Sequence, residues 1–443
     1  GGAVADGPAL AQRWQGFVDY ARFEAVTASY DVLAAFDQAP GSLEERCAAV
    51  AIELGNARRT HPFSPLLARM DERCAADAPA REQAAAESIA LRDFLLADGA
   101  GTSARKPVLV MTEADALALV EQLGGEALYG RYEVMRPGGS VQFVATWLDP
   151  AGQRERKLHF DILQLWHLLK TAPDEERYPA FEQGLTQRFL QESMSAGNAA
   201  AELAAITMAL ARGELAPAEA AGRIEGLALS GLTAAALELL PLCLALDDDG
   251  RCAANALDLV RPLAERGLGD AMLVMALAAS RGVEGAGGQR AAGRWLKRAA
   301  QRLGRVEADV AYAGLWLGVG DRAKIDRDLA SRIRGAARAG SVQAMLLLAD
   351  LLRQQRLAPL RRETATTWLQ RAAEQVSPAA RRRLGVAALK RGDIAHGWPL
   401  IQAAAAEDDR AALSLLATAL EQGQVGLAAD PPRALALFRR AAE

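Results

Sequence analysis

The chain has 443 residues, a mass of 47.0 kDa and a mean hydropathy of zero. Its 51% hydrophobic and 24% charged residues are typical of a folded globular protein, which excludes a disordered or collagen-like chain. No stretch reaches the roughly 18 uninterrupted apolar residues of a membrane span, so no transmembrane segment is expected. Alanine and leucine dominate, which predicts a mainly α fold.

The net charge of −4 is unevenly distributed. Residues 281–393 contain 23 Lys or Arg against 10 Asp or Glu, whereas residues 1–280 contain 24 against 39. This asymmetry favours either arginine-rich helix faces that pair between neighbouring helices or a basic surface for an acidic partner. The sequence leaves both interpretations open.

Residues 1–104 are predicted to form an N-terminal helical region. Ser42-Leu43-Glu44-Glu45 is a capping-box start, in which Ser42 accepts hydrogen bonds from first-turn N–H groups. Pro62, Pro65 and Pro79 are expected to separate helices.

Residues 105–165 are predicted to form a small α+β module with antiparallel strands. Strands are expected at 107–111, 128–135, 141–148 and 154–160, with a helix starting at Thr112 and a hairpin turn at 136–140. The last strand is expected at the sheet edge, where Arg154, Arg156 and Lys157 would block pairing with another chain. The module is either a binding insert or a structural spacer, and residues 166–196 are expected to be a helical connector.

A repeat of about 36 residues organises residues 197–443. One equivalent alanine marks each unit, at intervals of 36, 36, 37, 36, 31 and 38 residues: Ala228, Ala264, Ala300, Ala337, Ala373, Ala404 and Ala442. A second apolar helix pattern recurs at 270–281, 308–318, 342–354, 378–390 and 410–422. Two helices per unit predict stacked helical hairpins, because one hairpin alone cannot bury its apolar faces.

The last unit shows the pattern most clearly. Residues 412–417 open a helix that ends at Glu421-Gln422-Gly423, and residues 433–443 form the second helix. The pattern resembles the Sel-one-like (Sel1-like) repeat family, a relative of the tetratricopeptide repeat. The resemblance implies a C-terminal αα-hairpin superhelix, or solenoid, over residues 197–443 that acts in protein–protein interaction.

Four cysteines form two sequence-local pairs, Cys47 with Cys74 and Cys243 with Cys252. Two disulfides in an oxidising compartment and four buried thiols are both compatible with this spacing. The hairpin with Cys243 and Cys252 around the turn 247–250 is similar to a disulfide-clamped hairpin of the cysteine-rich secreted branch of the family. The resemblance implies that this pair is bridged, with Cys47 and Cys74 expected to join two helices likewise. The expected location is periplasmic or secreted, with a lipid-anchored full-length form left open.

Motifs for catalysis are absent from the sequence. It contains no nucleophile elbow, phosphate-binding loop, dinucleotide fingerprint or zinc-ligand spacing, so no metal, cofactor or enzymatic activity is expected. His159 and His167 flank Asp161, a combination that would suit a base with an orienting carboxylate. A hydrolase housed in residues 105–165 is therefore the last-ranked alternative.

The expected function is that of a noncatalytic interaction protein of the bacterial cell envelope. It would hold a partner protein as a scaffold or adaptor, or as an inhibitor or immunity protein of a secreted toxin. The alternative is binding of an anionic exopolysaccharide or peptidoglycan, and no nucleic-acid partner is expected. Arginine can bind carboxylates in bidentate fashion, and the expected partner-binding residues are Arg298, Arg302, Arg353, Arg356, Arg381, Arg382 and Arg383.

Overall fold

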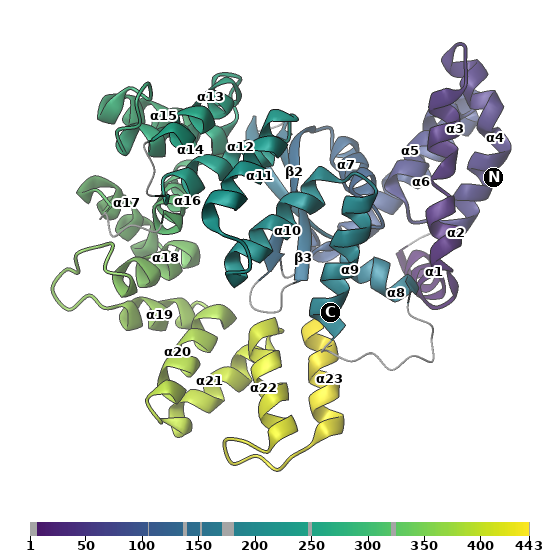
Figure 1. Cartoon of the computed structure of the whole chain (residues 1–443). Coiled ribbons are helices and arrows are strands. Elements are labelled where there is room, and N and C mark those ends of the chain that lie inside the picture. The colour runs from purple at the N-terminus through teal and green to yellow at the C-terminus, as the bar shows by residue number, and fades with distance from the viewer. Residues whose placement is uncertain are drawn as a thin grey trace. The chain divides into compact units, whose positions relative to one another are not determined.

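The computed structural model describes residues 7–104, 106–135, 140–150, 153–170, 181–246, 250–319 and 325–442. The chain divides into two compact units, Gly1–Glu133 with Ser140–Glu176 and Val134–Gly139 with Arg177–Glu443. Helices predominate in both units, and a small four-stranded sheet belongs mainly to the first (Figure 1). The mainly α fold with a small α+β module is confirmed, while the finer domain boundaries stay a prediction.

The first unit begins with a series of short helices. These are α1 (Gly7–Tyr20), α2 (Phe23–Ala28), α3 (Asp31–Gln38), α4 (Leu43–Thr60), α5 (Pro65–Cys74) and α6 (Ala78–Leu95), followed by a 3-10 turn at Ala97–Gly99. The capping box at the start of α4 is present, because the Ser42 hydroxyl accepts from the Glu45 N–H at 3.3 Å and the Ser42 N–H donates to the Glu45 carboxylate at 2.7 Å. A disulfide between Cys47 and Cys74 joins α4 to α5, with 5.1 Å between their Cα atoms. The first cysteine pairing is confirmed.

The corner between α4 and α5 is filled by aromatic rings. His61 is 1% exposed and stacks on Phe17 of α1, with 5.0 Å between the ring centroids. Phe63 meets the ring of Trp14 edge-on at 4.9 Å. Ring contacts of this kind hold α1 against the corner through apolar burial and favourable quadrupole geometry.

A buried carboxylate lies beside this corner. Asp115 of α7 (Glu113–Gln122) accepts hydrogen bonds from the hydroxyls of Ser64 and Tyr30 and from the Thr112 N–H at 3.2 Å. Burial and the Asp115 charge raise the pKa of Tyr30 well above its usual value. Asp115 can be buried because its oxygens have these donors, and it ties α7 to the helical region.

The sheet has the strand order β1-β4-β3-β2, with the strands β1 (Val108–Leu109), β2 (Glu126–Met135), β3 (Ser140–Asp149) and β4 (Arg154–Asp161). Strands β3 and β4 are antiparallel, and α8 (Ile162–Lys170) follows β4. Residues 136–139 of the predicted hairpin turn lie outside the described residues.

The position of the last strand differs from the expectation. Strand β1 pairs in parallel with the end of β4, Val108 with Phe160 and Leu109 with Asp161. The expectation that β4 forms the edge of the sheet is therefore wrong, because the first strand returns beside it. Since β1 is only two residues long, Arg154 and Arg156 lie on the part of β4 beyond it.

The second unit consists of helices that follow one another in chain order (Figure 1). After α9 (Phe181–Ser195) they are α10 (Ala199–Arg212), α11 (Pro217–Leu229), α12 (Thr233–Cys243), α13 (Arg251–Glu265), α14 (Gly269–Ser280), α15 (Gly288–Leu303), α16 (Arg305–Gly318), α17 (Arg327–Arg338), α18 (Val342–Arg353), α19 (Ala365–Glu374), α20 (Pro378–Lys390), α21 (Ile394–Ala406), α22 (Arg410–Gln422) and α23 (Pro431–Ala442).

From α10 onward the helices form antiparallel hairpins, each pairing an even-numbered helix with the next odd-numbered one. Every helix packs on the next in the chain, and α12, α14, α16 and α18 also pack successively on one another. The repeat alanines all lie in the second helices of the hairpins, as the solenoid prediction requires. Helix α14 has hydrophobic residues on every side and is buried from Ala271 to Ala279, because helices on both sides cover it.

Small residues allow a close helix crossing in the shortest hairpin. A Cβ on Gly385 of α20 would lie 2.8 Å from the carbonyl oxygen of Gly397 in α21, and one on Gly397 would lie 2.9 Å from the Gly385 oxygen. The two helices touch through their backbones at this point. The close approach and the short turn 391–393 account for the interval of 31 residues in this unit.

The second disulfide joins the end of α12 to the start of α13. Cys243 and Cys252 are bonded, with 5.4 Å between their Cα atoms, which confirms the pairing. Residues 247–249 of the turn lie outside the described residues. Among the helices of the described residues, none combines the length and the apolar character that a membrane crossing requires.

Candidate interaction surface

Three of the expected partner-binding arginines lie side by side in α20 and are paired within the solenoid. Arg382 contacts Asp409 at 2.8 Å, Arg381 forms an ion pair with Glu407, and Arg383 contacts Asp350 of α18 at 3.0 Å. Glu407 is the C-cap residue of α21, in the same hairpin as α20, whereas Asp350 belongs to α18 and Asp409 is the N-cap residue of α22, in the hairpins on either side. Arg382 and Arg383 therefore join α20 to neighbouring hairpins, and Arg381 joins it to the end of α21. This is the pairing between neighbouring helices that the sequence left open as an alternative.

Arg356 is 3% exposed, and its side chain contacts the protein backbone in the interior. Its guanidinium donates to the carbonyl oxygens of Val319, at 3.1 Å, and Trp316. Its own carbonyl accepts from the Ile325 N–H at 3.1 Å. The end of α18 is thereby fixed to the end of α16, and the Arg356 guanidinium is withdrawn from the surface.

Arg353 lies near Arg356 in the chain but, unlike Arg356, it is exposed to solvent. Its side chain is 69% exposed and contacts Asp350 at 3.1 Å, the same carboxylate that Arg383 contacts. Two cations thus share one carboxylate, which leaves excess positive charge at this end of α18.

The remaining two expected residues belong to α15, whose 16 residues include five basic side chains and no carboxylate. Arg302 is half-buried and lies against Gly267, where a Cβ would come within 2.8 Å of its Nη2. Arg298 is exposed and lies over the ring of Trp295, with 4.6 Å from its Cζ to the ring centroid.

Helix α15 also presents basic residues that the sequence analysis did not select. Arg290, Arg294 and Lys297 are exposed, and none of them forms an ion pair within the part of the chain that the structure describes. With Arg298 they follow the spacing i, i+4, i+7, i+8, which places them on one side of the helix. We call these four residues the α15 face. Their spacing was visible in the sequence, but their lack of carboxylate partners was not.

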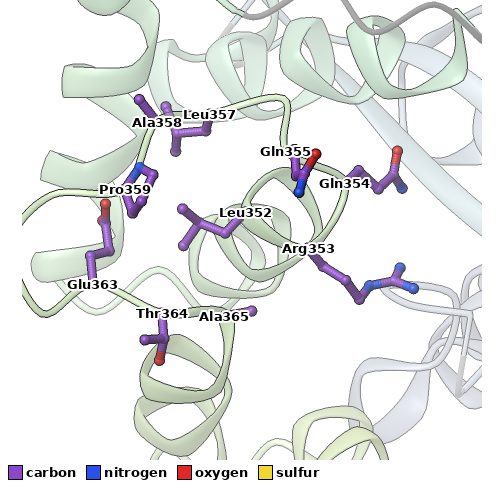
Figure 2. Close-up of a pocket in the computed structure, with 10 residues that line it drawn as sticks. All are labelled: Leu352, Arg353, Gln354, Gln355, Leu357, Ala358, Pro359, Glu363, Thr364 and Ala365. Atoms are coloured by element: carbon purple, nitrogen blue, oxygen red, sulfur yellow. The ribbon is translucent and has the colours of Figure 1, made fainter.

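A pocket opens between α18 and α19. It has a volume of about 870 Å³ and lies where the end of α18, the linker of residues 354–364 and the start of α19 meet. Figure 2 shows Leu352 between the linker residues Leu357, Ala358 and Pro359 on one side and Thr364 on another, with the Arg353 side chain directed away from Pro359. This pocket was not apparent from the repeat pattern of the sequence. The long segment between the helix patterns of α18 and α19 was the feature of the sequence that could have pointed to it.

The structure describes the surroundings of two residues that were considered for catalysis, His159 and Asp161. Asp161 caps α8 by accepting the Gln164 N–H at 2.7 Å, and Nδ1 of His159 is buried without a hydrogen-bond partner in the described chain. Burial lowers the pKa of His159. No group of three or more His, Cys, Asp and Glu side chains in the described ranges has the arrangement of a metal site.

Comparison with known proteins gives matches among solved structures. The chain is 24% identical to a Sel1 repeat protein from Oxalobacter formigenes over 50% of this chain and 64% of that one, with a TM-score of 0.29. A protective antigen of uropathogenic Escherichia coli strains, displaying an SLR fold, is 16% identical over 99% of this chain and 87% of its own length, with a TM-score of 0.30. This chain resembles Sel1-like repeat proteins. The repeat pattern of the sequence pointed to the same resemblance.

The description of residues 197–443 as a solenoid of helical hairpins rests on their own helices and contacts, since both TM-scores are below 0.5. The chain spans 64% of the Oxalobacter protein, less than two thirds of its length. No protein-family model matches the chain, and no curated protein matches it.

Proposed function

We propose that this chain is a noncatalytic interaction protein of the bacterial cell envelope, which binds an acidic partner protein through the α15 face. Its role is that of a scaffold or adaptor, or of an inhibitor or immunity protein for a secreted toxin. The two disulfides support an oxidising compartment, periplasmic or extracellular, because disulfides persist there. The bacterial setting comes from the family resemblance alone.

The contrast between α15 and α20 carries the proposal. Both helices are basic and lack carboxylates, yet Arg381, Arg382 and Arg383 are each paired with a carboxylate elsewhere in the solenoid. Arg290, Arg294 and Lys297 project into solvent without an acidic partner in the described chain. A row of like charges on one helix face repels itself, and an acidic partner would relieve this repulsion.

The surroundings of Trp295 also suit a protein partner. Trp and Arg are the residue types that contribute most to the centres of protein interfaces. Trp295 is half-buried and carries Arg298 over its ring, so the α15 face combines cations with an aromatic surface.

A capture experiment tests the proposal. The full chain would be immobilised and exposed to an envelope extract at low and high salt, alongside the variant R290E/R294E/K297E. The matched control is K390E/R391E, which reverses two exposed cations at the end of α20 that form no ion pair in the described part of the chain. The proposal predicts an acidic protein that the wild type and the control retain at low salt and release at high salt.

The purified partner then allows a direct measurement of association. Reversal of the α15 charges should slow association by about tenfold or more, because electrostatic steering is lost, while the control remains close to wild type. An unchanged association rate in the α15 variant would refute the proposal. Recovery of an anionic glycan without any protein would establish the polysaccharide alternative instead.

A further inference from the structure

The linker between α18 and α19 is unusually long for this solenoid. Eleven residues, 354–364, separate the two helices, whereas three to eight residues separate the two helices of each other hairpin from α10 to α23. Most of the linker is exposed, including Leu360 at 50%. A helical hairpin does not require this length to turn.

Two buried arginines hold the linker in place. Arg356 anchors its start through the carbonyl oxygens at the end of α16. Arg334 of α17 anchors its end, donating to the Glu363 carboxylate at 2.6 Å and to the Ala358 carbonyl at 2.8 Å. Glu363 also accepts from the Leu360 N–H at 2.9 Å and from the indole N–H of Trp368 at 3.1 Å. The linker is thus a fixed, preorganised segment.

The fixed linker forms one wall of the α18–α19 pocket. Leu352 at the end of α18 and Leu357 with Pro359 in the linker supply apolar surface (Figure 2). The exposed amides of Gln354 and Gln355 also line the pocket and can bond to a peptide backbone. The volume of about 870 Å³ is within the range of small-ligand and short-peptide sites.

The charge around the pocket is positive. Arg353 lines it and shares its carboxylate with Arg383. Arg361 and Arg362 are not part of the lining, but they lie in the linker between the lining residues Pro359 and Glu363, are exposed, and form no ion pair in the described part of the chain. Glu363, the carboxylate in the lining, is already held by Arg334. We call Arg353, Arg361 and Arg362 the rim arginines.

We propose that the α18–α19 pocket binds a short, extended peptide segment of the partner protein, in which an apolar side chain is flanked by Asp or Glu. The apolar side chain lies against Leu352 and Pro359, and the flanking carboxylates face the rim arginines. The inference rests on the proposed function and names the part of the partner that is recognised. Preorganisation of the linker favours such binding, because little ordering is left to occur when the peptide arrives.

Selection from a bead-bound library of random seven-residue peptides, with the full chain as the target, tests the inference. Labelled peptides from the selection are then titrated with wild-type protein and with A358W, which fills the pocket from an exposed position in its lining. The matched control is A428W, which places the same bulk at an exposed position of the α22–α23 linker. The charge variant R361E/R362E has K390E/R391E as its control.

The expected peptides carry an apolar residue next to Asp or Glu. A358W and R361E/R362E should each weaken their binding by about tenfold or more, while both controls stay within about twofold of wild type. Equal binding to A358W and wild type, or selection of peptides without carboxylates, would overturn the inference. Binding of an alginate oligosaccharide would also overturn the inference if wild type and A358W bound it equally and R361E/R362E did not bind it.

The result separates the inference from the proposed function. If R290E/R294E/K297E loses the acidic partner and A358W retains it, the partner does not use the pocket and only the inference fails. If selected peptides bind in the pocket and R290E/R294E/K297E keeps the partner, the role of the α15 face fails while the pocket stands.

Discussion

Arg334 and Glu363 form a buried ion pair between α17 and the α18–α19 linker, with 2.6 Å between Nη2 and Oε2 and both side chains less than 10% exposed. Burial alone would raise the pKa of Glu363, but the hydrogen bonds from Arg334, the Leu360 N–H and Trp368 outweigh it and hold the pKa below its usual value. The pair fixes the wall of a pocket that the repeat pattern does not describe.

We predict that R334M destabilises the protein by about 3 kcal/mol or more, because it leaves the Glu363 carboxylate buried without its cation. Urea unfolding followed by circular dichroism would measure the loss. R353M removes an arginine from an exposed pair and should cost at most about 1 kcal/mol. Similar losses in the two variants would contradict a special role for the buried pair.

Substitution of the glycines at the α20–α21 crossing should also destabilise the protein. G385A places a Cβ 2.8 Å from the Gly397 carbonyl oxygen, so the helices must separate at a cost of about 1–3 kcal/mol, despite the better helix propensity of alanine. The control is G335A in α17, where the new Cβ would have no neighbour within 4 Å. Thermal unfolding should give a lower Tm for G385A and an equal or higher Tm for G335A. A stabilised G385A would show that the crossing is looser than described.

Loss of either disulfide should lower stability by about 3 kcal/mol on the chain-entropy estimate, with the larger effect for Cys47–Cys74 because it closes the longer loop. The double variants C47A/C74A and C243A/C252A, unfolded in urea without reductant, measure each loss. Thiol titration of denatured protein from its native host tests whether the protein resides in an oxidising compartment. Four free thiols in that titration would contradict the envelope location.

His61 should make the stability of the first unit depend on pH. Burial lowers its pKa to about 4 in the folded protein, against 6.5 when exposed. The unfolded state therefore takes up a proton first, and the free energy of unfolding falls as pH drops from about 6.5 towards 4. At the lower end of this window the loss is roughly 3 kcal/mol.

H61F keeps a ring against Phe17 and removes this titration, so its stability should decline less between pH 7.5 and 4.5 than that of the wild type. H396F is the control, because His396 is 84% exposed in α21. Urea unfolding at the two pH values measures the difference. Parallel declines in wild type and H61F would assign the acid sensitivity to other groups.

Much of the fold was predictable because its signals are local. The helices from α14 to α22 follow apolar patterns that lie within single segments, and the cysteine pairs are close in the chain. The interior position of β4 between β1 and β3 was not predictable in the same way. The two-residue strand β1 has almost no pattern of its own, and its parallel pairing with Phe160 and Asp161 spans about 50 residues.

The helical hairpins, their period, the pairs of neighbouring cysteines and the excess of arginine in residues 281–393 could all be recognised in the chain before folding was considered. The role of each arginine depends on the folded arrangement. Arg381 meets a carboxylate 26 positions away and Arg356 reaches carbonyl oxygens 37 and 40 positions away, whereas Arg290 and Arg294 meet no carboxylate in the described chain. The physical reason is that a guanidinium is neutralised by what folding brings within a few ångströms of it, and neighbours along the chain do not reveal this.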